Sequence, residues 1–269
     1  MTRLEKTNTD MQNRYERKYV AFIDLLGFSN LVRDSADEDN GPNKVMAVLD
    51  RFKSTVEATG KNGLRVKHFS DCLVVSVDAT QLGLMDLFTS LRTISDNLLQ
   101  IDMLVRGAVT VGPFYHTDES VFGPPLQEAY EMESKTVGIP MIELTEEVMK
   151  DVDEFPQDLD KILVVRFSEF PDRNFVHYLL MWSYYDAVPR AGAMVLDEPG
   201  QLVRHYIAKR LADHTGSVRE KAAWMKKYWD ETVAAAGYFP EVDEDADLPY
   251  PVGAMPFRTK IMQIANQKS

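Results

Sequence analysis

The sequence has little of what secreted and membrane proteins need: one cysteine among 269 residues, and only short apolar runs. A single cysteine excludes a disulfide within the chain, which fits a reducing compartment. No apolar run approaches the roughly 20 residues of a membrane-spanning helix. Met1–Tyr19 is polar and lacks the apolar segment of a signal peptide. We therefore expect a cytoplasmic protein with no membrane partner.

Basic residues are also scarce, with 30 Lys and Arg against 42 Asp and Glu and a formal net charge of −12. Such a chain lacks the basic footprint that attracts a nucleic-acid backbone, so we expect no nucleic-acid partner. An acidic protein can still bind a nucleoside triphosphate when divalent cations lie between its carboxylates and the phosphates. The hydrophobic share of 45% and the charged share of 27% are typical of a folded globular protein.

The hydrophobic pattern predicts an α+β fold. The predicted strands cover 19–24, 64–69, 72–77, 103–111, 141–144 and 162–167, and the segment 112–123 is a loop or hairpin. The predicted helices cover 25–34, 43–59, 82–99, 126–134, 201–212, 218–236 and 257–266. The first part reads strand, helix, strand, strand, helix, strand, which is the order of a ferredoxin-like, palm-type domain. We divide the chain into a polar lead-in (1–18), this domain (19–182) and a mainly helical C-terminal extension (183–269).

Two aspartates stand where this order of strands can bring them together. Asp24 ends the first predicted strand, and Asp71 lies between the two strands of the predicted hairpin. Two converging carboxylates repel each other unless divalent cations neutralise them. The Leu25 carbonyl is a further candidate ligand, and Gly27 would let the backbone approach a phosphate closely. Each aspartate alone has an ordinary alternative, namely capping a helix or filling a hairpin turn.

Four segments, taken in order, resemble the motifs of class III nucleotidyl cyclases. Phe22–Phe28 resembles their first metal motif, Phe-x-Asp-x-x-Gly-Phe, and Lys67–Asp71 resembles the second. Arg106–Gly112 is similar to the strand Arg-x-Gly-Ile-x-x-Gly, and Phe122–Glu133 is similar to the helical segment that follows it. The resemblance covers roughly 19–145 and implies an enzyme that closes a nucleoside triphosphate into a 3′,5′-cyclic monophosphate.

The departures from these motifs point to one branch of the superfamily. Gln127 and Glu131 stand where the usual enzymes carry a transition-state Asn and Arg, Pro124 replaces the adenine-reading Asp, and Ser70 replaces a glycine. These departures resemble the divergent bacterial cyclases of the Pycsar antiphage system. That resemblance implies a homodimeric cyclase that makes cyclic UMP or cyclic CMP, with active sites at the interface, and we favour a uridylate cyclase. Its product, cyclic UMP, would act on a separate effector protein.

The resemblance also assigns roles to residues. Asp24 and Asp71, with the Leu25 carbonyl, would hold two divalent metals, Mn²⁺ by preference and Mg²⁺ as the alternative. Arg106 would stabilise the transition state in place of the missing arginine, although a salt-bridging arginine would look the same in the sequence. Lys67 occupies the base-reading position, or is an outward residue of a half-exposed strand.

Several alternatives stay open at the level of sequence. Phe28 either packs beside the nucleotide or belongs to the core. Lys67 can donate a hydrogen bond to adenine as well as to a pyrimidine, so a cytidylate, adenylate or guanylate cyclase is the second hypothesis. The third hypothesis is a non-catalytic module that senses nucleotides, and Gln127 and Glu131 favour it.

Overall fold

The computed structural model describes residues 14–59, 63–135, 139–155, 164–168, 170–179 and 199–236. The helix expected at 257–266 and most of the lead-in 1–18 lie outside this part of the chain. The proposed division into 1–18, 19–182 and 183–269 stays a prediction. None of the helices in the described ranges is both long enough and apolar enough to cross a membrane.

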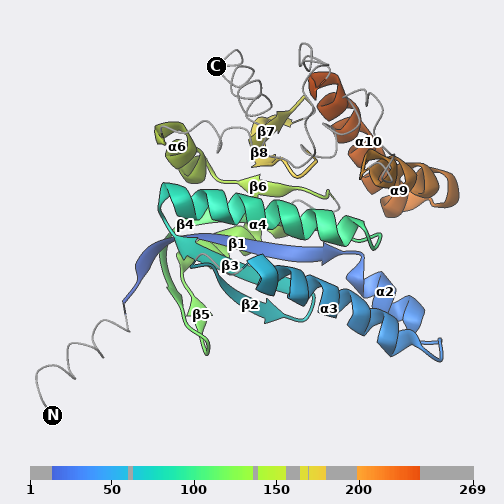
Figure 1. The fold of residues 1–269 in the computed structure, drawn as a ribbon, viewed down its shortest axis with the longest axis horizontal. Helices are drawn as coiled ribbons and strands as arrows, with labels where there is room; N and C mark the ends of the chain where they lie inside the picture. Colours follow the sequence, from blue (N-terminus) through green and yellow to red (C-terminus); the bar gives the residue numbers. More distant parts are fainter. Residues whose placement is uncertain are drawn as a thin grey trace, which may run out of the picture.

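The centre of the molecule is a sheet whose first four strands pair antiparallel (Figure 1). Its first four strands lie in the order β2-β3-β1-β4. They are β1 (Glu16–Leu26), β2 (Arg65–Phe69), β3 (Cys72–Asp78) and β4 (Leu104–His116). This order is that of the ferredoxin-like fold, so the predicted α+β, palm-type architecture is confirmed.

Helices α3 (Gly41–Thr59) and α4 (Gln81–Leu99) cover one face of this sheet (Figure 1). The odd-numbered residues of β1 point to this face, because successive side chains of a strand alternate. Helix α4 begins where the Thr80 side chain accepts a hydrogen bond from the Gly83 amide. Its leucines at 84, 87, 91 and 98 are fully buried, and each such burial contributes roughly 1.5–3 kcal/mol.

The even-numbered residues of β1 face the other way, toward helix α5 (Pro124–Lys135). Val20 and Phe22 join Ala129 of α5 in a small buried cluster on this side. Gly107 of β4 lets the strands approach each other here, because a Cβ at this position would lie 2.2 Å from the Phe22 carbonyl oxygen. This second face carries Asp24, which follows Phe22 by two residues on the same strand.

Further strands widen the sheet beyond β4. Strand β6 (Ile142–Leu144) lies parallel to β4 and is followed by β8 (Phe170–Val176) and β7 (Val164–Phe167), while β5 (Val121–Phe122) forms a hairpin with the end of β4. The remaining helices are α2 (Phe28–Ser35), α6 (Glu146–Glu154), α9 (Pro199–Asp213) and α10 (Gly216–Ala236). Helices α9 and α10 lie together beside β7 and β8 (Figure 1) and share a buried cluster with them.

The structure corrects several predicted boundaries and adds two elements. The strand predicted to end before Gly112 continues through Pro113 to His116. Pro113 is tolerated because β6 pairs only with Gly107–Val109, so the missing amide falls beyond that pairing. Helix α6 and strand β8 were not predicted. The helix predicted at 25–34 starts later, at Phe28, after Gly27 turns the chain with a φ of 89°.

Candidate metal centre

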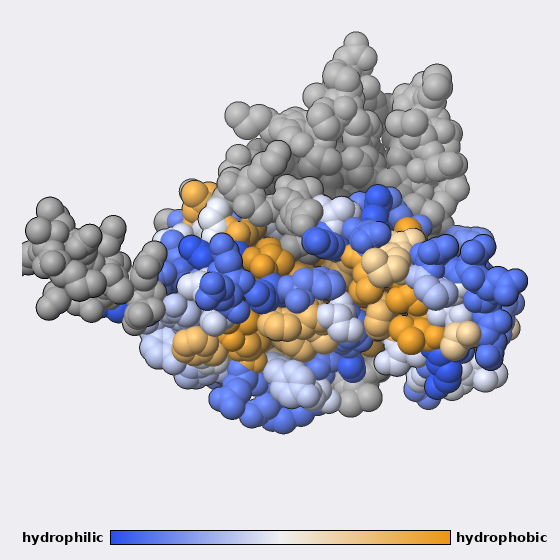
Figure 2. Space-filling view, turned by 90° about the horizontal axis from the view of Figure 1, so that it is seen from below, coloured by the Kyte–Doolittle hydropathy of each residue, from blue (hydrophilic) through white to orange (hydrophobic). Residues whose placement is uncertain are grey.

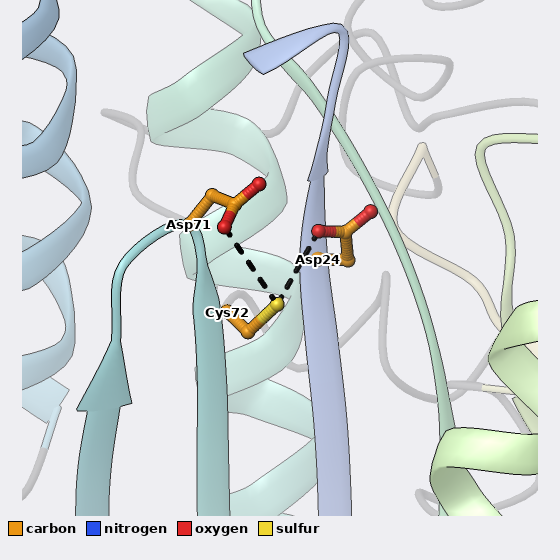
Figure 3. A group of neighbouring side chains, drawn as sticks. All are labelled: Asp24, Asp71 and Cys72. Carbon is orange, nitrogen blue, oxygen red and sulfur yellow. Dashed lines mark hydrogen bonds between the residues drawn. The ribbon is translucent and has the colours of Figure 1, made fainter. Parts of the chain in front are cut away.

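Asp24, Asp71 and Cys72 meet at the point where β1 and β3 pair. In the strand register Asp24 lies opposite Cys72, and Asp71 is the residue just before β3 begins. One ligand atom from each of the three side chains lies within 4.8 Å of the others. Figure 3 shows the Cys72 sulfur between the two carboxylates, 3.4 Å from Asp24 Oδ1 and 4.0 Å from Asp71 Oδ1. The strands therefore bring together the two aspartates singled out in the sequence.

A tight turn at Ser70 and Asp71 places the second carboxylate. Ser70 adopts a left-handed backbone conformation with a φ of 53°, a region where glycine carries less strain than serine. The Leu25 amide donates a hydrogen bond to the Asp71 carbonyl oxygen at 3.2 Å, which joins this turn to the end of β1. The backbone of Leu25 is thus part of the site. The role of its carbonyl as a metal ligand stays a prediction.

Arg106 links the metal centre to a third carboxylate. Its guanidinium contacts Asp24 Oδ2 at 2.9 Å from the terminal nitrogen and at 3.0 Å from Nε, which itself lies 2.5 Å from Glu133 Oε1. Burial raises the pKa of Asp24 above its usual value, while the charge of Arg106 opposes that rise. Burial likewise raises the pKa of Glu133, again opposed by Arg106. Arg106 therefore stabilises the ionised form of both acids.

The thiol of Cys72 acts as a hydrogen-bond donor in this cluster. Burial and the neighbouring carboxylates raise the pKa of Cys72 to about 12, so the sulfur carries its proton at neutral pH. The oxygen ligands of the cluster are the carboxylates of Asp24 and Asp71, which are partly buried and close together. Mg²⁺ and Mn²⁺ prefer such oxygen ligands, so the residues present fit a hard divalent cation.

The other predicted site residues lie around this cluster in different ways. Phe28 packs in the core with residues of α3 and α4, and only 7% of its surface is exposed. Its place beside the nucleotide stays a prediction. Lys67 donates to the Asp118 carbonyl oxygen at 2.6 Å, in the turn between β4 and β5. Glu131 is exposed and lies 4.0 Å from Lys135, its neighbour one helical turn along.

An apolar groove of about 670 Å³ adjoins the metal centre. Cys72 and Phe22 form part of its wall, and Pro124 and Gln127 line it from α5. Large apolar side chains remain exposed along it, namely Phe69 (46%), Phe122 (47%) and Tyr130 (56%). Figure 2, which views the molecule from below the orientation of Figure 1, shows hydrophobic residues gathered in a band across an otherwise hydrophilic face.

Sequence reasoning missed two charged residues of the site, Glu133 and Lys221. Glu133 is the last residue of the segment that resembles the cyclase motif, and its carboxylate gave no separate signal. Lys221 lies in α10, where it interacts electrostatically with Arg106 and Asp24. No sequence pattern predicts that Lys221 and Arg106 lie close together, because they are 115 positions apart in the chain.

Comparisons with known proteins give likenesses of structure alone. No family model matches the sequence, and no curated protein sequence matches it significantly. A bacterial light-regulated adenylyl cyclase is similar with a TM-score of 0.44 and 14% identity, over 77% of this chain and 58% of the other. The guanylyl cyclase domain of the RhoGC fusion protein from the aquatic fungus Blastocladiella emersonii gives a TM-score of 0.44 and 16% identity, over 61% and 96%.

A third solved structure is a class III adenylyl cyclase-like ATP-binding protein from Pseudomonas aeruginosa. It gives a TM-score of 0.43 and 12% identity, over 81% of this chain and 43% of the other. This chain thus spans little more than half of the light-regulated cyclase and less than half of the Pseudomonas protein. At such identities and TM-scores, none of these likenesses assigns an activity to this chain.

Proposed function

We propose that this chain is a nucleotide cyclase of the class III type, which converts a nucleoside triphosphate to a 3′,5′-cyclic monophosphate and pyrophosphate. The observation that carries the proposal is the convergence of Asp24 and Asp71, whose ligand atoms lie within 4.8 Å of each other and of Cys72. Two of the four segments contain these acids and resemble metal-binding motifs, which supports the proposal, and both acids lie on a ferredoxin-like sheet.

The residues of the site suit this reaction. Two Mn²⁺ or Mg²⁺ ions, when held by Asp24 and Asp71 with the Leu25 carbonyl, would supply Lewis-acid activation of the ribose 3′-hydroxyl and neutralise phosphate charge. The 3′-oxygen then forms a bond to the α-phosphorus as the bond to the pyrophosphate oxygen breaks, and the hydroxyl proton leaves to solvent. The protein contributes mainly alignment and fixed charge.

Arg106 is the cation best placed to stabilise charge on the reacting phosphate. Its guanidinium is held at the carboxylates by Asp24 and Glu133. Neither Gln127 nor Glu131 can supply the positive charge that the usual arginine provides, and Glu131 faces solvent. A planar guanidinium suits the oxygens of a phosphate, so Arg106 fits the transition-state role.

UTP is the substrate we favour, with CTP next. Pro124, which lines the groove, cannot accept a hydrogen bond from the adenine amino group through a side chain, which disfavours ATP. Lys67 would read the base once its ammonium leaves the Asp118 carbonyl oxygen. By its resemblance to Pycsar cyclases, the chain would generate cyclic UMP as the signal of a bacterial antiphage defence system, read by a separate effector.

A second copy of this chain is the partner that the apolar groove fits. Four aromatic side chains (Tyr15, Phe69, Phe122 and Tyr130) stay about half exposed along it, and the groove reaches the metal centre through Cys72 and Phe22. A contiguous apolar patch of this kind on a soluble domain marks an interface. Docking of a second copy there would bury the patch and close the active site at the dimer interface.

Incubation with ATP, GTP, CTP and UTP in turn, with Mn²⁺, tests the proposed reaction directly. We expect cyclic UMP as the main product, identified by mass, and its loss when the metal is chelated. Asp24→Asn and Asp71→Asn should each lower kcat by about a thousandfold or more, because a metal ligand is lost. Asp153→Asn, at an exposed position of α6, is the matched control and should leave the rate unchanged.

The same assay separates the alternatives. A cyclic purine product would retain the enzyme class and overturn the pyrimidine assignment. Nucleotide binding without turnover would favour the non-catalytic module. Gln127 and Glu131, which stand in place of the usual Asn and Arg, also favour that module. Absence of any cyclic product, together with wild-type nucleotide binding by Asp24→Asn, would refute the proposed function.

A further inference from the structure

Helix α10 shares a buried cluster with the ends of the two strands that carry Asp24 and Arg106. Trp224, Met225 and Tyr228 of α10 belong to one buried cluster with Leu26 of β1 and Leu104 of β4. Trp224, Met225 and Tyr228 follow Lys221 by 3, 4 and 7 residues. At this spacing all four side chains lie on one side of α10. The buried side of α10 therefore belongs to the same cluster as the two strand ends.

Strand alternation places this contact beside the metal centre. Leu26 pairs with Leu104, and Asp24 pairs with Arg106, so each leucine lies two residues from its charged neighbour along the same strand. Side chains two apart on a strand point to the same face. The charged residues thus form a row on one face of the sheet, with the α5 cluster on one side and α10 on the other.

Lys221 is the residue that α10 directs toward this row. It is partly buried and lies one helical turn before Trp224 and Met225. Its charge interacts with those of Arg106 and Asp24, and burial together with Arg106 lowers the pKa of Lys221. Within the described residues it forms no ion pair, whereas Arg106 contacts both Asp24 and Glu133. A second cation is thus held beside Arg106 without a carboxylate of its own.

We propose that Lys221 binds the β- and γ-phosphates of the substrate and the pyrophosphate that leaves, so that the C-terminal helices complete the active site. This proposal rests on the proposed function. Without metal the site holds three carboxylates, Asp24, Asp71 and Glu133, against Arg106 and Lys221. Divalent cations at the aspartates would reverse this balance. The site would then attract a polyphosphate, for which a lysine ammonium is a suitable point charge.

Binding of inorganic tripolyphosphate, measured by calorimetry with Mn²⁺ present, tests Lys221 without any need for turnover. Lys221→Met keeps most of the aliphatic stem and removes the charge. We expect it to weaken binding by about tenfold, the effect of one lost charge-assisted hydrogen bond. Lys221→Arg should recover most of the loss. Lys226→Met is the matched control on the same helix, because Lys226 is exposed and pairs with Asp230.

Steady-state kinetics provide the second measurement. Lys221→Met should raise the KM for the nucleoside triphosphate and weaken product inhibition by pyrophosphate, each by about tenfold, with circular dichroism unchanged. Cyclic product from the wild type, with unaltered KM and tripolyphosphate binding in Lys221→Met, would overturn this inference and leave the proposed function intact. No cyclisation by the wild type, with tripolyphosphate binding that depends on Lys221, would refute the reaction and retain the anion site.

Discussion

Ser70 shows, at the scale of a single residue, how the site is held in place at a cost in backbone energy. A serine with a φ of 53° lies in the left-handed region, where an L side chain costs roughly 1 kcal/mol relative to glycine. The next residue is Asp71, so the strained turn directs a candidate metal ligand. The motif that this segment resembles carries glycine at this position, which the backbone conformation explains.

Ser70→Gly should therefore stabilise the fold. We expect the free energy of unfolding in urea to rise by about 0.5–1 kcal/mol. Glycine removes the backbone strain of the folded state, and this gain exceeds the cost of the extra conformational entropy that glycine gives the unfolded chain. Ser70→Ala keeps the Cβ atom and with it the strain, so this control should not gain stability. A loss of stability in Ser70→Gly would show that the serine side chain, and not its backbone, matters here.

The sequence predicts single residues of the site only where a strand or turn ends at them. Asp24 and Asp71 both follow apolar runs that read as strands, so topology alone could bring them together. The ion pairs of Arg106 with Asp24 and Glu133 depend on how α5 packs against β4, and local spacing does not encode that. Phe28 begins helix α2, and its position in the core depends on how this helix packs, which the sequence alone does not predict.

At the scale of elements, the hairpin of β4 and β5 is held by a buried histidine. Ser76 Oγ and His116 Nδ1 lie 2.7 Å apart, which ties the end of β4 to β3. Lys67 adds a hydrogen bond to the turn at Asp118. Burial lowers the pKa of His116 to about 4, and the charges of Arg65, Lys18 and Lys67 add to this, while Asp118 opposes it.

Acidification should therefore destabilise the fold through His116. Between pH 6.5 and about 4 the unfolded histidine binds a proton and the folded one does not, so the free energy of unfolding falls as the pH falls. The contribution is at most about 3 kcal/mol. His116→Gln, which does not titrate, should flatten this slope in urea unfolding at pH 7.5 and 4.5. His205→Gln, exposed on α9, is the control. An unchanged slope in His116→Gln would contradict the assignment.

Long elements with a clear hydrophobic period were predicted well, and short polar ones were not. Helix α4 shows its buried leucines in the sequence, and its predicted range of 82–99 matches Gln81–Leu99 closely. Helix α6 buries only Val148 and Val152 along a strongly acidic segment. Two apolar positions are too few to give a helical hydrophobic pattern in the sequence. Strand β8 contains a proline and two charged residues, which read as a loop until β6 and β7 pair with it.

At the scale of the whole molecule, the apolar groove predicts association of two chains. Phe69→Asp and Tyr130→Asp place a charge on half-exposed side chains at its border, where the monomer fold should tolerate them. We expect the wild type to be a dimer by light scattering after gel filtration, and both variants to be monomeric and inactive. Leu82→Asp, at a position 67% exposed outside the groove, should remain dimeric and active. A monomeric, active wild type would rule out the dimer.

The order of strands in the sheet affects how the protein can fold during its synthesis on the ribosome. Strand β1 precedes the other described strands in the chain, and both of its partners, β3 and β4, come later. Asp24 meets Arg106 only after 82 further residues have been added. Until then an apolar strand has no neighbours, and such non-local pairing forms slowly and invites wrong contacts. The growing chain therefore adds 82 residues after Asp24 before its most buried strand can pair on both sides.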